Sequence, residues 1–168
     1  MDQTPPQGLL IVWWSVTGGS EALARAAFEG ALRSRATTVR LLAAPDVEAA
    51  DLVTAAGLLF VTPEMLGSMA GRMKEFFERT YYPLLDRIAG RPCALIVCAG
   101  SDGTGAARQV ERIVTGWRLR WIDAPMIVVT GAQTPEAIAA PKRIDGPALA
   151  RASSLGEAMA EGLAMGLW

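Results

Sequence analysis

Five short apolar runs, each bounded by turn residues, constrain the fold of this chain more than any other feature. They span residues 9–14, 39–42, 57–61, 93–98 and 126–129. Apolar side chains predominate within each run rather than alternating with polar ones. This is typical of strands that are buried on both faces, as in a parallel sheet.

Helical periodicity separates these runs. Apolar side chains recur at three- and four-residue spacings within residues 23–31, 73–77, 110–117 and 147–164. Strands that alternate with helices predict an α/β fold, a three-layer doubly wound five-stranded parallel sheet. The crossover at residues 44–55 shows one short helix after Asp46, and residues 133–146 are predicted to form a loop.

Length and composition favour one compact domain. The chain has 168 residues, close to the usual prior of about 150 per domain, so we expect residues 9–168 to form a single domain after a disordered lead-in, residues 1–8. That lead-in lacks the features of a signal peptide, which favours a cytoplasmic protein. No apolar run approaches the roughly 20 residues needed to span a bilayer. With 51% hydrophobic residues, the chain is expected to form a homo-oligomer, a dimer or a tetramer.

Several function classes are disfavoured by residue type. The chain has no histidine, so Ser-His and Cys-His nucleophiles and histidine metal sites are excluded. Its net charge is −1, without a basic cluster, which disfavours nucleic acid as a partner. Cys93 and Cys98 lie in one predicted strand, about 16 Å apart, too far for a disulfide between them. An enzyme built on this chain would rely on a cofactor, and we assign no catalytic side chain and no metal ligand.

The doubly wound order 2-1-3-4-5 predicts where a ligand binds. In such sheets the site lies beyond the carboxyl ends of the strands, where the strand order switches between strands one and three. Three loops meet there, after Trp14, Val61 and Cys98.

The first loop joins hydroxyls and glycines to the start of a helix. Ser15, Thr17 and Ser20 supply hydroxyl donors, while Gly18 and Gly19 allow the backbone to close around an anion. A phosphate can be held there without a basic side chain. The alternative is that Ser20 only caps the helix. The loop matches neither the nucleoside triphosphate motif G-x-x-x-x-G-K-[ST] nor the dinucleotide motif G-x-G-x-x-G.

Residues 13–21, WWSVTGGSE, resemble the FMN phosphate loop of the flavodoxin-like superfamily. The aromatic pair at the strand end is Trp13 and Trp14 here, where the family commonly has two tyrosines. Adjacent strand residues point to opposite faces, so these two side chains are expected to pack under the two helix layers. Either is also a candidate for the floor of a flavin site.

The second loop, TPEMLGSMAGRMKEFFER at residues 62–79, is similar to the flavin-edge loop of NAD(P)H-dependent FMN and quinone reductases. These include the Trp-repressor-binding-protein-like and NADPH-dependent FMN reductase-like proteins. The resemblance implies flavin contacts from this loop, at Pro63, Glu64, Met65, Leu66, Gly67, Ser68 and Met69. Glu64 is equally compatible with a solvated carboxylate, and Met69 with helix core. Met65 and Leu66 stand where the reductases often place an aromatic residue.

The third loop is rich in glycine, which lets backbone approach a flat ligand. In the resembled family this loop holds the polar edge of the flavin, which implies contacts from Gly100, Ser101, Asp102, Gly103 and Gly105. The alternative is a helix capped by Thr104 after flexible glycines.

Two function classes follow from the resemblance. One is an FMN-binding NAD(P)H-dependent oxidoreductase that passes hydride to FMN and on to a small-molecule electron acceptor. The other is a flavodoxin-like electron carrier without its own NAD(P)H turnover. Carriers are usually strongly acidic and flank the ring with aromatic residues, and this chain shows neither feature, so we favour the reductase. A domain that has lost its cofactor is a third class, which the intact first loop disfavours.

Substrate-side residues are less well defined. Backbone N–H groups near Gly67 and Ser68 are candidates for the reacting edge of the flavin, and Thr104 or Tyr82 for substrate contacts. Arg118 and Arg120 could meet the 2′-phosphate of NADPH or lie on the surface.

Overall fold

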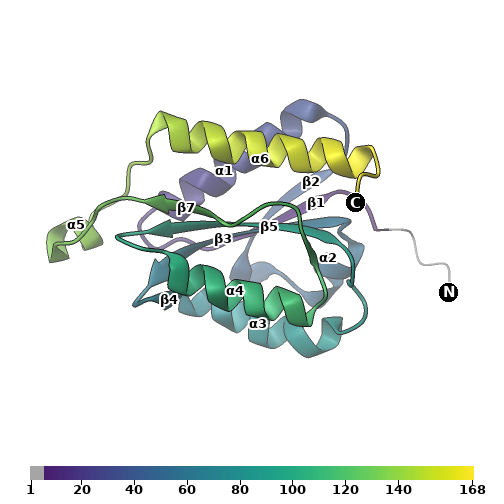
Figure 1. Ribbon diagram of the computed structural model, residues 1–168, viewed down its shortest axis with the longest axis horizontal. Coiled ribbons are helices and arrows are strands. Elements are labelled where there is room, and N and C mark those ends of the chain that lie inside the picture. The colour runs from purple at the N-terminus through teal and green to yellow at the C-terminus, as the bar shows by residue number, and fades with distance from the viewer. Residues whose placement is uncertain (1–5) are drawn as a thin grey trace.

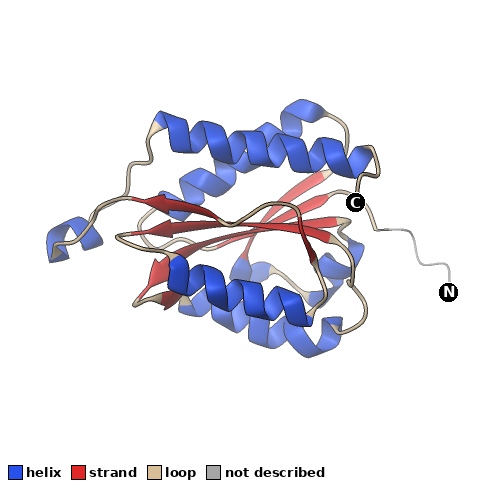
Figure 2. Ribbon diagram, in the orientation of Figure 1, coloured by secondary structure: helices blue, strands red, loops and turns tan. Residues whose placement is uncertain are grey.

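The computed structural model describes residues 6–168, which form a seven-stranded sheet between two layers of helices (Figure 1; Figure 2). The strands are β1 Leu9–Trp13, β2 Val39–Ala43, β3 Gly57–Met65, β4 Ser68–Met69, β5 Pro92–Ala99, β6 Arg120–Trp121 and β7 Met126–Val129. The order is β2-β1-β3-β5, and β5 pairs in turn with β6 and β7, all in parallel. The predicted order 2-1-3-4-5 is confirmed, because the five predicted strands correspond to β1, β2, β3, β5 and β7.

Helices cover both faces of the sheet. They are α1 Gly19–Ser34, η1 Ala44–Asp46, α2 Ala49–Thr54, α3 Gly71–Leu84, α4 Thr104–Gly116, α5 Pro135–Ala139 and α6 Gly146–Ala164. α1 and α6 lie on one face, and α3 and α4 lie on the other (Figure 1). Within the described residues, no helix is both long enough and apolar enough to cross a membrane.

Two apolar cores explain the continuous apolar runs. Leu10 and Val12 of β1 pack toward α3 and α4, while Leu9 and Ile11 pack toward α1 and α6. Neighbouring strand residues face opposite sides, so a strand covered on both sides needs apolar side chains at every position. Trp14 packs against the first core and Trp13 against the second, as their opposite orientations predict.

The structure differs from the sequence prediction at three places. β3 runs four residues beyond Val61 and turns into the short antiparallel strand β4. β6 is an additional strand at residues 120–121, paired with the start of β5. The predicted loop at residues 133–146 contains the five-residue helix α5.

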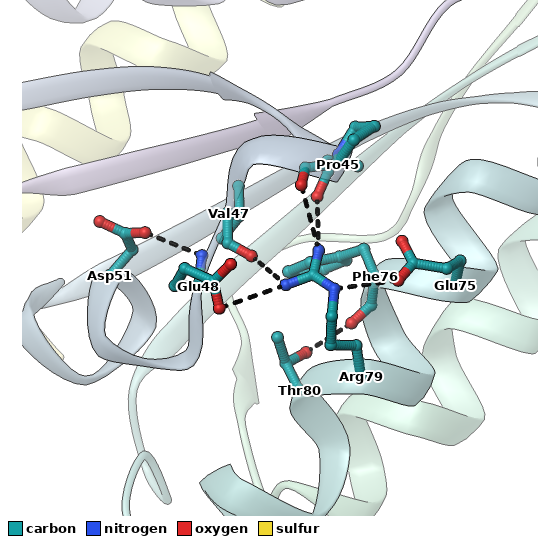
Figure 3. A network of polar contacts seen from close by, with 9 residues as sticks. Pro45, Val47, Glu48, Asp51, Glu75, Phe76, Arg79 and Thr80 are labelled. Atoms are coloured by element: carbon teal, nitrogen blue, oxygen red, sulfur yellow. Dashed lines mark hydrogen bonds and ion pairs between the residues drawn. The ribbon is translucent and has the colours of Figure 1, made fainter.

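The connection from β2 to α2 is held by a side chain from a distant helix. The guanidinium of Arg79, on α3, donates to the carbonyl oxygen of Val47 at 2.6 Å and to that of Ala44 at 3.3 Å (Figure 3). It also pairs with Glu75 at 2.9 Å. The predicted short helix after Asp46 is confirmed as α2, and its N-terminal Glu48 N–H is bonded to Asp51.

Ordered contacts begin before the first strand. The N–H of Gln7 donates to the carbonyl oxygen of Thr54 at 2.8 Å, and the carbonyl of Gly8 accepts the N–H of Ala56 at 2.9 Å. The predicted lead-in therefore does not extend to residue 8. Its first five residues lie outside the described part of the chain.

Candidate functional site

A cavity of about 620 Å³ opens at the carboxyl ends of β1, β3 and β5. This end of the sheet lies at the left of Figure 1, with the β3–β4 hairpin and α5 beside it. The volume is within the range of small-molecule sites. The lining residues are Ser15, Val16, Thr17, Gly19, Ser20, Pro63, Glu64, Met65, Leu66, Gly67, Cys98, Ala99, Gly100, Ser101, Thr130, Ala132, Ile138, Ala139 and Lys142.

The first loop turns sharply into α1. Gly18 is in the left-handed region with a φ of 88°, and its N–H donates to Ser15 Oγ at 3.0 Å. Ser15 therefore stabilises the turn as well as lining the cavity. Gly19 is closely packed, since a Cβ there would lie 2.7 Å from Cys98 Sγ. Gly18 does not line the cavity.

Ser20 is the unusual residue of this loop. Its side chain is buried and lines the cavity, and its hydroxyl has no well-formed hydrogen bond within residues 6–168. It is not the helix cap, because the N-cap residue of α1 is Gly18 and Ser20 lies within the helix. A buried polar atom without a partner is costly, and most such atoms in native proteins are bonded. The first turn of α1 also presents N–H groups that lack an acceptor within the helix.

The second loop is a hairpin rather than an irregular loop. Leu66 and Gly67 form its turn with φ of 54° and 71°, and the Leu66 side chain is fully exposed. Ser68 and Met69, predicted to contact flavin, do not line the cavity. The Oε1 of Gln109 accepts the Ser68 hydroxyl at 3.1 Å and the Met69 N–H at 2.9 Å, which ties β4 to α4.

Glu64 has a role that was not predicted. Its carboxylate accepts the N–H of Gly103 at 2.9 Å and that of Ala106 at 3.2 Å. It therefore caps the N-terminus of α4, where both the free N–H groups and the helix dipole favour a negative charge. The sequence left Glu64 open between a solvated carboxylate and a flavin contact. The structure shows a carboxylate that bonds to α4 and also lines the cavity, so the flavin contact stays a prediction.

The third loop contributes fewer residues than expected. Gly100 and Ser101 line the cavity, whereas Asp102, Gly103 and Gly105 do not. Gly105 serves packing between loops, since a Cβ there would lie 2.0 Å from the carbonyl oxygen of Gly67. Thr104 is the first residue of α4 rather than its cap, and its hydroxyl bonds to Asp102.

A fourth wall comes from the segment after β7, which sequence reasoning missed. Thr130, Ala132, Ile138, Ala139 and Lys142 all line the cavity. A detectable signal was present. The hydroxyl of Thr134 accepts the N–H of Ala137 at 3.2 Å, and Pro135 is the first residue of α5. Thr followed by Pro is a common start for a helix.

The other predicted contacts lie outside the cavity. Tyr82 is 78% exposed on α3. Arg118 pairs with Asp86 at 2.9 Å, and Arg120 donates to the carbonyl oxygen of Leu167 at 3.2 Å. Neither tryptophan of residues 13–14 lines the cavity either, so the candidate tryptophan floor for a flavin is absent from it.

Both cysteines are buried and free. Cys98 lies in the floor of the cavity beside Ser20. Burial raises the pKa of the Cys98 thiol, while the charge of Lys142 and the hydroxyl of Ser20 oppose that rise. Burial raises the pKa of Cys93 to about 12. Neither thiol has the lowered pKa of a reactive nucleophile.

Known proteins share parts of this sequence and the whole fold. A segment of 68 residues is 38% identical to the probable NAD(P)H dehydrogenase (quinone) FQR1-like 2 of Arabidopsis thaliana, covering 40% of this chain and 25% of that protein. A segment of 104 residues is 30% identical to a flavodoxin of Aquifex aeolicus (strain VF5), covering 61% of this chain and 54% of that protein. The chain thus spans between a quarter and about half of the length of these relatives.

Fold similarity extends further than sequence similarity. The crystal structure of a flavodoxin, WrbA-like protein from Agrobacterium tumefaciens superposes with a TM-score of 0.74 at 16% identity, over 95% of this chain and 98% of that one. The family model described as NADPH-dependent FMN reductase matches residues 43–135, which is more than half of the chain. With its flavodoxin-like sheet order and its cavity at the switch point, the chain belongs to the NADPH-dependent FMN reductase family.

Proposed function

We propose that this protein is an FMN-binding, NAD(P)H-dependent oxidoreductase of the quinone or flavin reductase type. The observation that carries the proposal is the buried hydroxyl of Ser20 at the start of α1, which has no well-formed hydrogen bond within residues 6–168 and lies in the wall of a cavity at the switch point of the sheet. A phosphate at this position would satisfy that hydroxyl and the N–H groups of the first helical turn. Family membership supports the same cofactor.

The cavity offers different chemistry at its two ends. Ser15, Thr17, Gly19 and Ser20 would hold the phosphate end of FMN. The β3–β4 hairpin and the third loop would hold the ring, through Pro63, Glu64, Met65, Leu66, Gly67, Gly100 and Ser101. Gly18, Ser68, Met69, Asp102, Gly103 and Gly105 do not line the cavity, so direct FMN contacts from these residues stay predictions.

Bound FMN would supply the redox chemistry, with NAD(P)H as the hydride donor and a small molecule as the electron acceptor. The chain positions these groups and shapes access to them. Within residues 6–168, the cavity is lined by no Trp, Tyr or Phe side chain. A wall without aromatic residues leaves room for a nicotinamide or an acceptor beside the ring, which supports a reductase.

An electron carrier is the second candidate function. The 30% identity to the Aquifex aeolicus flavodoxin over 104 residues supports it. The net charge of −1 does not, because carriers that dock to basic partners rely on a strong opposite field.

Two measurements on the purified protein separate these functions. The first is an absorption spectrum, with FMN titrated if no flavin is retained, and we expect tight FMN binding. The second follows oxidation of NADH and of NADPH with and without an added quinone. Turnover supports the reductase, flavin binding without turnover supports the carrier, and no affinity for FMN contradicts both.

We also propose a cytoplasmic homo-oligomer, a dimer or a tetramer, without a nucleic acid partner. The homo-oligomer is supported by the exposed apolar side chains around the cavity, where Val16, Met65, Leu66 and Ile138 are 57, 39, 104 and 54% exposed. Exposed apolar patches commonly mark interaction surfaces. Size-exclusion chromatography with light scattering tests the assembly, and a monomer at all concentrations would contradict it.

A further inference from the structure

Lys142 is the one basic residue among the described residues that line the cavity, and it lies beyond residues 43–135, the part of the chain that the family model matches. It follows α5 and is half-buried in the cavity wall. The Cβ atom of Lys142 packs against the start of α1. If Gly19 carried a Cβ atom, it would lie 3.2 Å from the Cβ of Lys142. A basic side chain therefore stands at the end of the cavity that we assign to phosphate.

Two sets of hydrogen bonds hold Lys142 in place. Its backbone N–H donates to the carbonyl oxygen of Thr17 at 2.7 Å, which joins this segment to the first loop. Its ammonium donates to the carbonyl oxygens of Ala137 and Ile138, both at 2.8 Å, and of Ala140, at 2.6 Å. The Lys142 side chain thus caps the C-terminus of α5, and these hydrogen bonds hold its ammonium group in a defined position.

No carboxylate neutralises this charge within the described residues. Glu21, in the first turn of α1, pairs with Arg25 at 2.8 Å. Glu64 is the other charged residue that lines the cavity, and both of its oxygens accept N–H groups of α4. The field of Lys142 does reach the cavity floor, where it opposes the rise in the pKa of Cys98.

We propose that Lys142 is a specificity-determining residue: its side chain packs against the start of α1, and its fixed positive charge makes the cavity select phosphorylated flavin, FMN, over the uncharged flavin riboflavin. This inference rests on the proposed function and goes beyond it. The charge and the dipole at the first turn of α1 would act on the same anion, and both interactions are stronger in a partly enclosed site than in water. All three ammonium protons are already bonded, so the charge acts through its field, without a direct hydrogen bond to the phosphate.

The test compares dissociation constants for FMN and riboflavin in four full-length proteins, by quenching of flavin fluorescence at low and high salt. They are the wild type, Lys142→Gln, Lys142→Arg and Arg143→Gln. Glutamine keeps donors for the α5 carbonyls but removes the charge, while arginine keeps the charge. Arg143→Gln is the matched control, because Arg143 is exposed, adjacent in sequence and not part of the cavity wall.

We expect Lys142→Gln to weaken FMN binding roughly tenfold at low salt, with riboflavin binding unchanged. High salt should reduce this difference. Lys142→Arg and Arg143→Gln should keep the preference of the wild type for FMN.

Two results would overturn the inference while the proposed function stands. One is a Lys142→Gln protein with the same preference for FMN as the wild type. The other is an equal loss of affinity for both flavins, which would mean that Lys142 acts only by holding α5. A wild-type protein that binds neither flavin would overturn the proposed function and this inference together.

Discussion

The Ser20 side chain is buried, and among the residues that the structure describes its hydroxyl has no well-formed hydrogen bond, a combination that is rare in native proteins. A buried hydroxyl without a well-formed hydrogen bond costs free energy in the folded chain. A bound phosphate would supply the hydrogen-bond acceptor that the Ser20 hydroxyl lacks within residues 6–168.

Replacing Ser20 with alanine should affect the free and the loaded protein in opposite directions. Without FMN, the free energy of unfolding should stay unchanged or rise by up to about 1 kcal/mol, because an unsatisfied polar atom is removed. FMN binding should weaken by about 1.5–3 kcal/mol, the contribution of a hydrogen bond to a charged group. Urea unfolding and flavin titration measure the two effects, with the exposed Ser154→Ala as a control. Unchanged FMN affinity would mean that the phosphate lies elsewhere.

Cys93 should make the fold sensitive to alkaline pH. Burial raises its pKa from 9.0 to about 12 in the folded chain. Between these values the unfolded thiol loses its proton and the folded one keeps it, so rising pH favours the unfolded state. The free energy of unfolding is therefore unaffected by ionisation of this thiol below pH 9. Above pH 9 it falls by about 1.4 kcal/mol per pH unit because of Cys93.

Urea unfolding from pH 7 to pH 11 checks this dependence. A Cys93→Ala variant should be less stable at pH 7, because it leaves a small cavity in the core. It should, however, lose less stability than the wild type above pH 9. Parallel pH profiles for the two proteins would contradict the assignment.

Among the elements, α4 depends most clearly on a distant residue. Its N-terminus is capped by the carboxylate of Glu64, at the end of β3, and its Gln109 holds β4 through Met69. The hairpin and the helix therefore stabilise each other. This places the second and third loops at a defined distance across the cavity.

A Glu64→Gln variant should lose about 1–2 kcal/mol of unfolding free energy at pH 7. The amide has one acceptor oxygen for two N–H groups and no charge for the helix dipole. The matched control is Glu29→Gln, because Glu29 is exposed on α1 and outside the observed ion pairs, and it should change stability by less than about 0.5 kcal/mol. Equal stability of the two variants would argue against the cap.

In the whole molecule, the cavity is formed at the edge of a rigid sheet by four segments that are far apart in sequence. They are the start of α1, the β3–β4 hairpin, the end of β5 and the segment that follows β7. A ligand that contacts all four should stabilise the folded chain as a unit.

FMN should therefore raise the melting temperature. At a free concentration 100 times its dissociation constant, a ligand adds about 2.7 kcal/mol, or roughly 5–10 °C for a chain of this size. A thermal-shift titration with FMN measures this effect, with AMP as a control for a phosphate without the flavin ring. A melting temperature that is independent of FMN would contradict the proposed function.

Sequence patterns predicted those features that depend on neighbours in the chain. The strands β1, β2, β5 and β7 were located within two residues, because burial on both faces requires a continuous apolar run. The packing of Trp13 and Trp14 on opposite faces of the sheet followed from the two-residue period of a strand. The three loops of the site followed from the strand order, and each of them does contribute to the cavity.

The sequence by itself thus determined the layered fold and the edge of the sheet where the cavity lies. The tertiary structure decided which polar groups of those loops are free to meet a ligand. Glu64 and Ser68 were candidate flavin contacts, and both bond to α4. Ser20 was a candidate phosphate contact with helix capping as the alternative, and within residues 6–168 its hydroxyl has no well-formed hydrogen bond. The physical reason is that a hydrogen-bonding group takes the partner that folding brings within about 3 Å, and such partners here lie some forty residues away in the chain. Periodicity and local motifs describe only the residues nearby.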